Sequence, residues 1–580
     1  MTARTAGPKS WRVRGMAAAD AHLARSLARS LGLDEVAAGL LVARGYGDAG
    51  EAAKLLNPSF DQLHDPSLML GMTDSVARVL RAVDAGERIL VYGDYDVDGT
   101  TGTVVLRRAL SLLGAKTGFH VPHRFTEGYG IRQDVLERAR REGYSLVISV
   151  DCGIRAHAPL LWAKENGLDV IVTDHHLPDD DEGAPPAFAV LNANQRGCPY
   201  PDKNLAGVGV AFKLAHACLR ERGREKLIRG FLKVVAIGTV ADMAPLVGEN
   251  RAIVSLGLAD LPGATNPGLR ALMEIASVGG NGREVSATDL GFRIGPRINA
   301  AGRMDAARAV VELFEATDAD EARRLAQHLD ERNRERQVVQ KQITERALAE
   351  AEAGGDCGAA VVVAGAGWHR GVVGLAASKV AEKLGRPAVV ISLDEDGTGH
   401  GSARSVGGYH LLNGLTSCAD LFESFGGHAQ AAGLVIRGER VDELRRRLGE
   451  HAGEFMTESD CAPSLQIDAE LDASAITLDL AAGLERLEPF GIGWPRPVFA
   501  TRGLKIAREP QILKGRHFKF QLAGGDGREL TALWWNAAET PAATPRSGQS
   551  IELAYRIETD YWRGENRLQL IVEDLRDSVA

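Results

Sequence analysis

Three aspartates, Asp94, Asp96 and Asp98, stand at alternate positions in one short stretch of the chain. They follow an apolar run, 89–91, that is typical of a buried strand, and they precede a run, 100–113, with helical spacing. Because residues i, i+2 and i+4 of an extended segment point to the same side, the three carboxylates are expected to converge. Converging carboxylates repel one another unless a cation lies among them. The stretch therefore predicts a metal site, with a solvated acidic turn as the alternative.

Three further apolar runs each end in an acidic residue. Successive parallel strands bring their carboxyl ends to one edge of a sheet, so Asp96, Asp98, Asp151 and His175 are expected to meet there. A carboxylate-rich set with one or two imidazoles suits Mn²⁺ or Mg²⁺, whereas a thiolate-rich set would suggest zinc. The three run ends are Asp151 after 146–150, Asp174-His175-His176 after 170–173, and Asp242 after 234–241.

The four acid-bearing motifs resemble those of the DHH phosphoesterase superfamily. Within it, the chain is similar to the RecJ family, whose members degrade single-stranded DNA from its 5′ end. The resemblance covers nearly all of the chain and implies a metal-dependent 5′→3′ exonuclease that acts in DNA repair and recombination. The motifs are Tyr-Gly-Asp-Tyr-Asp-Val-Asp-Gly at 92–99, Val-Asp-Cys-Gly at 150–153, Thr-Asp-His-His at 173–176 and Gly-Thr-Val-Ala-Asp-Met at 238–243.

The resemblance also implies a mechanism with two ions, Mn²⁺ or Mg²⁺. Asp151 is expected to bridge them, and Asp94 and Asp174 are expected to orient water or ligands. His176 is expected to face the phosphate, either as a donor or as a proton carrier for the leaving oxygen. The implied metal ligands are Asp96, Asp98, Asp151, His175 and Asp242.

Two stretches between residues 122 and 303 offer contacts for a nucleic acid. Arg124 and Tyr129 lie in a glycine-punctuated segment, where the guanidinium suits a phosphate and the ring suits a base. An ordinary surface loop is the alternative. Asn299 and Arg303 lie in 291–303, where three glycines and a proline predict a loop that contacts phosphates. Pairing of one of its arginines with an acid at a domain junction is the alternative.

The second half of the chain contains two glycine-rich segments, 399–405 and 425–433. They resemble the signature segments of the DHHA1 domain that accompanies DHH domains. The resemblance implies that Ser402 and Arg404 grip the terminal phosphate of the substrate. It implies that His428, which follows two glycines, contacts the phosphate under attack. A glycine-flanked histidine considered alone is more typical of a turn.

The pattern of strands and helices predicts the fold class. From 72 to 245 strands alternate with helices, which is typical of an α/β, doubly wound parallel sheet. The predicted strands there are 89–92, 118–121, 146–150, 170–173 and 187–191. The expected parts are an N-terminal helical lead-in (1–71), a DHH catalytic domain (72–316), a long connecting helix (317–354), a smaller DHHA1 α/β domain (355–460) and a C-terminal β barrel (461–580).

The last part contains short strands with polar alternation and glycine-rich turns, which indicate a small barrel. The resemblance identifies it as an OB fold that binds nucleic acid. Aromatic side chains beside cations suit sequence-tolerant binding of a single strand, although aromatic residues of a barrel usually belong to its core. The candidates are Lys514, Arg516, His517, Lys519, Trp534, Trp535, Tyr561 and Trp562.

The composition of the 580-residue chain is that of a soluble globular protein, with 45% hydrophobic and 25% charged residues. Its net charge of −9 argues only slightly against DNA binding, because phosphate recognition depends on local charge. The six cysteines lack the spacing of a zinc ribbon and fit a reducing compartment. No apolar run approaches the roughly 20 residues of a membrane span, and the N-terminus lacks a secretory signal. We therefore expect a cytoplasmic protein.

Two other functions remain open from the sequence. A small-molecule DHH enzyme, such as a pyrophosphatase or a cyclic-dinucleotide phosphodiesterase, shares the motifs but lacks the barrel and the long helix. A catalytically inactive scaffold of the replication machinery does not need five ligand residues that repel one another. The resemblance further implies a single-strand-binding protein and a RecQ-type helicase as partners. The heptad pattern of the long helix is not sustained, which disfavours a coiled-coil dimer, and we expect a monomer.

Overall fold

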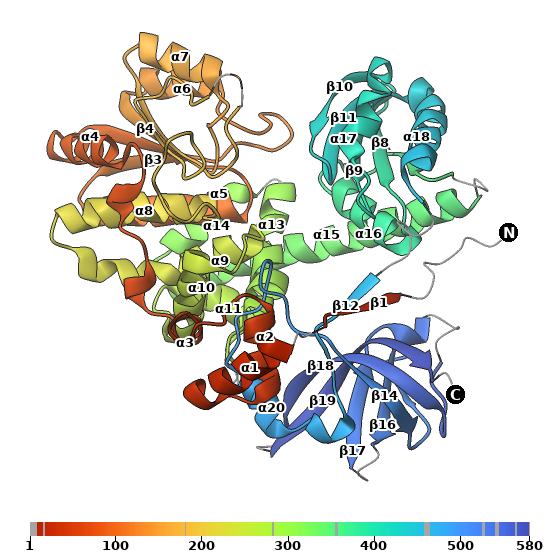
Figure 1. The fold of residues 1–580 in the computed structure, drawn as a ribbon. Helices are drawn as coiled ribbons and strands as arrows, with labels where there is room; N and C mark the ends of the chain where they lie inside the picture. Colours follow the sequence, from red (N-terminus) through yellow and green to blue (C-terminus); the bar gives the residue numbers. More distant parts are fainter. Residues whose placement is uncertain are drawn as a thin grey trace. The chain divides into compact units, whose positions relative to one another are not determined.

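The computed structural model describes residues 9–15, 18–179, 181, 183–280, 284–304, 306–353, 358–457, 464–524, 528–539, 544–562 and 565–578. The chain forms two compact units, and Figure 1 labels many of their elements. The first unit comprises Gly50–Arg334 and Leu487–Arg496. The second comprises Met1–Ala49, Glu335–Arg486 and Pro497–Ala580.

The first unit contains a sheet of five strands, all parallel. The five predicted strands are present, with ends that differ by no more than two residues. Parallel pairing puts the carboxyl ends of all five strands at the same edge, where the acid-bearing motifs follow β2, β4 and β5. In pairing order the strands are β3 (Lys116–His120), β2 (Arg88–Tyr92), β4 (Tyr144–Val150), β5 (Asp169–Thr173) and β6 (Ala189–Leu191).

Helices cover both faces of this sheet, which confirms the doubly wound architecture. Ile89 and Val91 of β2 pack into the apolar cluster formed with α4, α5 and α8. Leu90 and Tyr92, which point the other way, pack into the cluster formed with α6 and α7. The helices are α4 (Met72–Asp84), α5 (Val97–Leu112), α6 (Gln133–Arg141), α7 (His157–Glu165) and α8 (Gly207–Glu221).

A helical layer with its own apolar cluster completes the first unit. The apolar run that ends at Asp242 is the helix α9, so this acid follows a helix, whereas the other three motifs follow strands. The helices are α9 (Leu232–Ala241), α10 (Gly248–Asp260), α11 (Pro267–Ile275), α12 (Ala287–Asp289), the π-helical turn η5 (Leu290–Ile294), α13 (Gly295–Arg303) and α14 (Ala307–Glu315); α3 (Ala49–Leu56) precedes α4.

The predicted loop at 291–303 is wrong, because η5 and α13 are helical. Pro296 occupies the first turn of α13, where its missing N–H costs no hydrogen bond. Gly302 lies so close to Tyr95 that a Cβ atom would stand 2.2 Å from the Tyr95 carbonyl oxygen. The glycine thus allows close packing against the loop that carries Asp94 and Asp96. These tertiary contacts outweigh its poor helix propensity.

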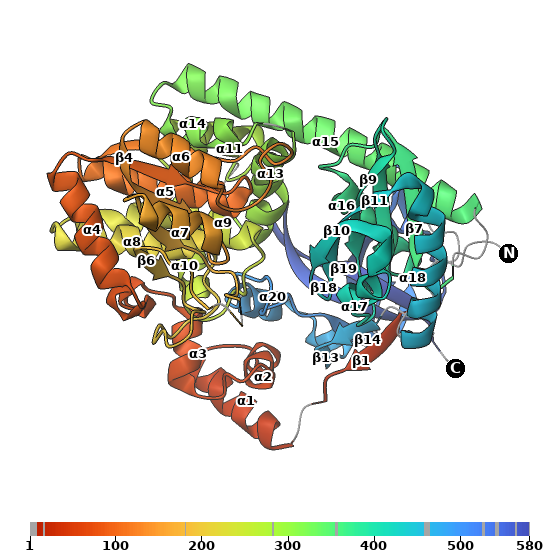
Figure 2. The same ribbon diagram turned by 90° about the horizontal axis from the view of Figure 1, so that it is seen from above.

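The long connecting helix is present as α15 (Ala319–Ala353). The Asp318 carboxylate accepts hydrogen bonds from the backbone N–H groups of Asp320 (2.9 Å) and Glu321 (2.8 Å), so it caps the start of the helix. Figure 2 shows α15 along its length.

A mixed five-stranded sheet forms the DHHA1 part of the second unit. Val361 and Val363 of β7 pack against α16 and the end of α15, whereas Val362 packs against α17 and α18. Only β7 and β8 pair in parallel; the other pairs are antiparallel. In pairing order the strands are β10 (Phe422–Gly427), β11 (Ala431–Arg437), β9 (Thr398–Arg404), β8 (Ala388–Leu393) and β7 (Val361–Ala366), with helices α16 (Val373–Leu384), α17 (Leu411–Thr416) and α18 (Val441–Phe455).

A β barrel forms the C-terminal part of the second unit. Neighbouring strands of the barrel pair in the spatial order β14, β18, β19, β17 and β16. A further pairing of β14 with β16 closes the ring, as expected for an OB fold. The strands are β13 (Ala469–Glu470), β14 (Phe499–Ile506), β15 (Gln511–Leu513), β16 (His517–Ala523), β17 (Glu529–Trp534), β18 (Ser550–Trp562) and β19 (Glu565–Asp577). The remaining elements of the unit are β1 (Ser10–Val13), β12 (Ser464–Ile467), α1 (Ala18–Leu31), α2 (Glu35–Ala43) and α20 (Leu478–Glu485). Within the described parts of the chain, every helix is too short or too polar to cross a membrane.

Candidate active site

The loop after β2 presents its three aspartates from a helix start. Asp96 is the N-cap of α5 and accepts the Gly99 N–H at 2.9 Å, while Asp98 lies in the first helical turn. The expectation that extended backbone makes the three carboxylates converge is therefore wrong. The three residues come together because Asp94 follows the end of β2, whereas Asp96 and Asp98 lie at the start of α5.

The Asp98 carboxylate is buried against the start of α8. Its two oxygens accept the N–H groups of Gly207 (2.6 Å) and Val208 (2.8 Å), which have no partner within their own helix. A Cβ atom on Gly207 would stand 2.7 Å from the Asp151 Cβ, so only glycine fits there. Sequence reasoning missed these two residues; the glycines 207 and 209 at the start of an apolar helix were the available signal.

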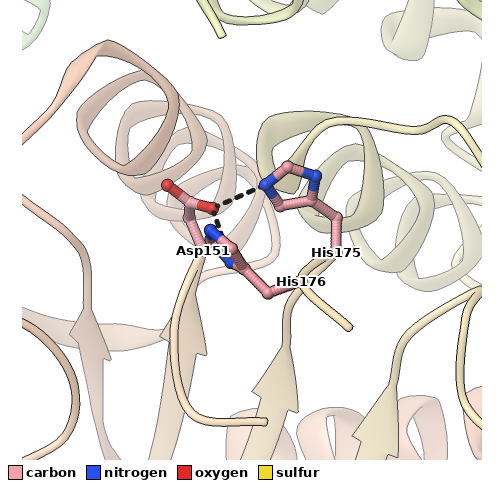
Figure 3. A group of neighbouring side chains, drawn as sticks. All are labelled: Asp151, His175 and His176. Atoms are coloured by element: carbon pink, nitrogen blue, oxygen red, sulfur yellow. Dashed lines mark ion pairs between the residues drawn. The ribbon is translucent and has the colours of Figure 1, made fainter. Parts of the chain in front are cut away.

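Three acids from separate parts of the chain meet at one imidazole. Nε2 of His175 lies 3.3 Å from Asp151 Oδ1 and 3.8 Å from one carboxylate oxygen each of Asp98 and Asp242. Figure 3 shows Asp151 at the end of its strand, with His175 and His176 facing it from the next. Asp151 adopts a left-handed conformation (φ 60°), which is uncommon for a residue other than glycine and is frequent at functional sites.

His176 forms a second imidazole–carboxylate pair. Its Nδ1 lies 2.8 Å from Asp174 Oδ1, and the Tyr129 hydroxyl lies 3.3 Å from the same nitrogen. Asp174 also accepts N–H groups from His175 (2.7 Å), His176 (3.1 Å) and Ile154 (2.9 Å). Asp174 therefore fixes the turn that carries both histidines.

The two histidines differ in their protonation. Burial, together with the charge of His176, lowers the pKa of His175 to about 4, so this imidazole is neutral at physiological pH. Burial also opposes protonation of His176, but the hydrogen bond and charge of Asp174 outweigh it and raise the pKa of His176. Burial would raise the pKa of Asp174, and the bond from His176 reverses this, so the pKa of Asp174 is lowered.

The clustered aspartates bind protons more tightly than isolated carboxylates do. Burial and the charge of Asp96 raise the pKa of Asp98 to about 7. Burial and the charge of Asp98 raise the pKa of Asp242 to about 9. The pKa values of Asp94 and Asp151 also lie well above the ordinary range, because both are buried among like charges. A divalent cation would remove this cost by replacing the protons.

The donor set fits such a cation. Asp94 Oδ1, Asp151 Oδ1 and His175 Nε2 are buried without a hydrogen-bond partner among the described residues. A neutral imidazole among carboxylates is the ligand chemistry of Mn²⁺ and Mg²⁺ centres. Three groups place one ligand atom per residue within 4.8 Å of one another: Asp151, His175 and His176; Asp98, His175 and Asp242; and Asp94, Asp96 and Asp151.

Four candidate DNA contacts belong to the same unit. The Arg124 guanidinium lies 5.0 Å from the centre of the Tyr95 ring, and Tyr129 donates to the Asp151 carbonyl oxygen at 3.2 Å. Arg303 lies close enough to Tyr95 to act on its pKa, and Asn299 is half-buried on the same helix, α13. Arg124, Tyr129 and Arg303 thus contact or approach the acidic loop and the strand end that carry Asp94 and Asp151.

The three candidates of the second unit gather at one end of its sheet. Arg404 donates to the Ser402 hydroxyl at 3.0 Å, and a Cβ on Gly374 would stand 3.0 Å from that hydroxyl oxygen and 3.2 Å from Arg404 Nη2. The first turn of α16 therefore lies beside both side chains. His428 is exposed in the β10–β11 turn, whose Gln430 carbonyl oxygen accepts the N–H of Ser405 at 2.9 Å. A helix N-terminus with an arginine and a hydroxyl is a chemical match for a phosphate.

Among the described side chains of the barrel, Trp535 is the exposed candidate for stacking. Trp535 is 52% exposed, and the His517 ring packs edge-on against it with the ring centres 4.7 Å apart. Trp534 is half-buried. The side chains of Tyr561 and Trp562 lie outside the described residues.

Three family models match the chain in order. The DHH family, N-terminal domain, matches residues 88–239, the DHHA1 domain matches 357–454, and the RecJ OB domain matches 467–574. Relatives bear the name single-stranded-DNA-specific exonuclease RecJ. The Bacillus subtilis protein is 38% identical over 557 residues, which are 96% of this chain and 70% of the relative. The Escherichia coli protein is 34% identical over 558 residues, with 92% and 95% covered.

Solved structures give the same result. RecJ from Thermus thermophilus in complex with Mn²⁺ superposes with a TM-score of 0.83 at 30% identity, covering 98% of this chain and 80% of that one. The complex with Mg²⁺ from the same organism gives a TM-score of 0.78 at 28% identity, covering 98% and 79%. With 34% identity over 95% of the Escherichia coli relative and the same three domain types in order, this chain belongs to the RecJ family.

Proposed function

We propose that this protein is a metal-dependent exonuclease that hydrolyses single-stranded DNA in the 5′→3′ direction. The observation that carries the proposal is the meeting of Asp98, Asp151 and Asp242 at the Nε2 atom of His175. The names of the relatives, and the Mn²⁺ and Mg²⁺ in the solved RecJ structures, support the same chemistry. A role in DNA repair and recombination is part of the proposal.

Two ions, Mn²⁺ or Mg²⁺, are proposed to bind at the acidic edge of the sheet. Asp151 is the proposed bridging ligand, because it is the carboxylate that two of the three ligand groups of the described residues share. When bound, such ions polarise the phosphate and lower the pKa of a water molecule that becomes the nucleophile. Asp94 orients the ligands from its buried position. The full proposed ligand set is Asp96, Asp98, Asp151, His175 and Asp242.

His176 is proposed to face the scissile phosphate. Its Nδ1 is engaged by Asp174, so Nε2 is the ring nitrogen left for the substrate, and the side chain is 45% exposed. Because its pKa is raised, the imidazole carries a proton that can pass to the leaving 3′ oxygen. Asp174 holds the ring in place and stabilises its charge.

The other candidates are proposed to hold the DNA strand. Arg124, Tyr129, Asn299 and Arg303 contact the nucleotides near the acids. Ser402 and Arg404 bind the terminal 5′ phosphate, which sets the polarity of degradation, and His428 contacts the phosphate under attack. The barrel, with Trp535 exposed, holds the incoming strand. A single-strand-binding protein and a RecQ-type helicase are the proposed partners of a monomeric, cytoplasmic enzyme.

The test is hydrolysis of a single-stranded oligonucleotide labelled at its 3′ end, in the presence of Mn²⁺, beside a duplex of the same sequence. We expect shortening from the 5′ side on the single strand only. Asp151→Ala should abolish it, and Asp134→Ala, which alters an acid whose side chain is 62% exposed, should not. An intact oligonucleotide with hydrolysis of dinucleotides would instead favour the small-molecule enzyme, and binding without hydrolysis of either would favour the scaffold.

A further inference from the structure

A ten-residue segment from late in the chain belongs to the first unit, which carries the clustered acids. Leu487–Arg496 belongs to the first unit, although the residues on either side of it along the chain belong to the second. Nothing in the acid-bearing motifs predicts a role for it.

One buried arginine fixes the segment. Arg251, on α10, is 3% exposed, and its Nη atoms donate to the carbonyl oxygens of Leu487 (2.9 Å), Glu488 (2.8 Å) and Pro489 (2.9 Å). The guanidinium also lies 5.3 Å from the centre of the Trp494 ring. A buried charge that loses such partners is costly, so the arginine and the segment hold each other in place.

The same segment covers the turn that follows Asp242. The Leu246 N–H donates to the Ile492 carbonyl oxygen at 2.7 Å. A Cβ on Gly493, which has φ +73°, would stand 3.1 Å from Pro245 Cβ, and one on Gly491 would stand 2.6 Å from Leu246 Cδ1. The two glycines thus let the backbone of the segment lie directly on Pro245 and Leu246.

The covered turn needs an external anchor. Met243, directly after Asp242, has φ 61°, a strained left-handed conformation for a non-glycine residue, and its side chain is 65% exposed. Strain of this kind persists only where the surroundings hold the backbone. Upstream the anchor is α9. Downstream the turn is held by the hydrogen bond from the Leu246 N–H to Ile492 and by the Asn250 side-chain amide, which donates to the Pro245 carbonyl oxygen at 3.1 Å.

We propose that Leu487–Arg496 is a positioning strap that holds Asp242 in place for metal binding, with Arg251 as its key residue. The proposal rests on the assignment of Asp242 as a ligand in the proposed function. In this arrangement the position of one acid of the cluster depends on a segment that follows the DHHA1 part in sequence. The strap contacts neither the ion nor the substrate and acts through the backbone that carries Asp242.

The experiment measures Mn²⁺ binding to full-length, metal-free protein from the electron paramagnetic resonance signal of free Mn²⁺. Arg251→Met removes the guanidinium, and its control is Arg229→Met, whose side chain is 63% exposed and pairs with Asp260. Gly493→Ala leaves every charge in place. Its control is Gly503→Ala, which pays the same backbone cost (φ +69°) but has no described atom within 4 Å of the Cβ position.

We expect Arg251→Met to weaken Mn²⁺ binding by about 10-fold or more, the range found when groups that orient a metal ligand are lost. Gly493→Ala should weaken binding in the same direction, and both controls should bind as the unaltered protein does. Near-ultraviolet circular dichroism checks that each variant is folded. A purely structural role would lower Tm without changing the Mn²⁺ affinity of the folded protein. Unchanged affinity in both variants would overturn the strap alone. Absence of Mn²⁺ binding to the unaltered protein would overturn the strap and the proposed function together.

Discussion

His176 and Asp174 form an ion pair in which the imidazole Nδ1 lies 2.8 Å from the carboxylate Oδ1. The bond raises the pKa of the imidazole and lowers the pKa of the carboxyl group. In the proposed mechanism His176 is the proton carrier, and this pairing with Asp174 favours its charged form.

Asp174→Asn should lower activity and change its pH dependence. Without the carboxylate, the pKa of His176 falls, so the alkaline decline of kcat/KM should move to lower pH. The expected loss in kcat/KM is about 10–100-fold, as for other residues that orient a metal site. A pH profile of oligonucleotide hydrolysis measures both effects. His176→Gln should remove this decline altogether, and an unmoved decline in Asp174→Asn would contradict the assigned role.

Removal of metal should make stability fall as pH rises. The pKa values of Asp98 (about 7) and Asp242 (about 9) exceed the value near 4 of an unfolded aspartate. A carboxyl group whose pKa is raised in the folded state stabilises the fold fully below about pH 4. It loses that contribution as pH rises through its folded pKa. In chelator, Tm should therefore decline between pH 4 and 9, and the gain in Tm on adding Mn²⁺ should be largest at the alkaline end.

The control for this titration is Asp242→Asn, which cannot ionise at position 242. In chelator its Tm should depend less on pH toward the alkaline end than that of the unaltered protein, and Mn²⁺ should raise it less. Equal pH dependence in the two proteins would show that the acids do not repel one another in the folded state.

Gly302→Ala should destabilise the acidic loop. A Cβ atom there would stand 2.2 Å from the Tyr95 carbonyl oxygen, and backbone cannot move aside cheaply. Overpacking of this kind costs about 1–3 kcal/mol. Urea unfolding measures the loss, and the matched control is Gly453→Ala in α18, where the nearest atom would be 3.9 Å away. The control should gain roughly 0.5–1 kcal/mol, because alanine is the better helix former.

Arg404→Met should reduce the preference for a 5′-phosphorylated end. The guanidinium lies with Ser402 beside the start of α16, an arrangement suited to a phosphate. We expect the ratio of kcat/KM for oligonucleotides with 5′ phosphate and 5′ hydroxyl to fall toward one. Arg437→Met, which alters an arginine of β11 whose side chain is 50% exposed and pairs with Glu423, should leave the ratio unchanged. An unchanged ratio in Arg404→Met would place the phosphate contact elsewhere.

Much of the fold was predictable from local pattern. The apolar runs at 146–150 and 170–173 and their terminal acids indicate buried parallel strands, and parallel strands must share one edge. This rule alone brings Asp151 and His175 together, as observed at 3.3 Å. The cap at Asp318 likewise marks the start of α15, because capping depends on residues next to one another in the chain.

Other features depend on partners that are remote in sequence. Helical backbone at 97–98 and 295–303 contradicts the local expectation, because Asp98 caps α8 and Gly302 packs on Tyr95. The contact of Arg251 with the carbonyl oxygens of 487–489 joins residues more than 230 positions apart. The sequence by itself determined the strand ends of the parallel sheet to within two residues, the candidate ligand types and the order of domains, since these follow from local periodicity and side-chain chemistry. Only the tertiary structure decided which backbone groups satisfy the buried acids and the buried arginine, because hydrogen bonding in the interior is settled by which segments pack together.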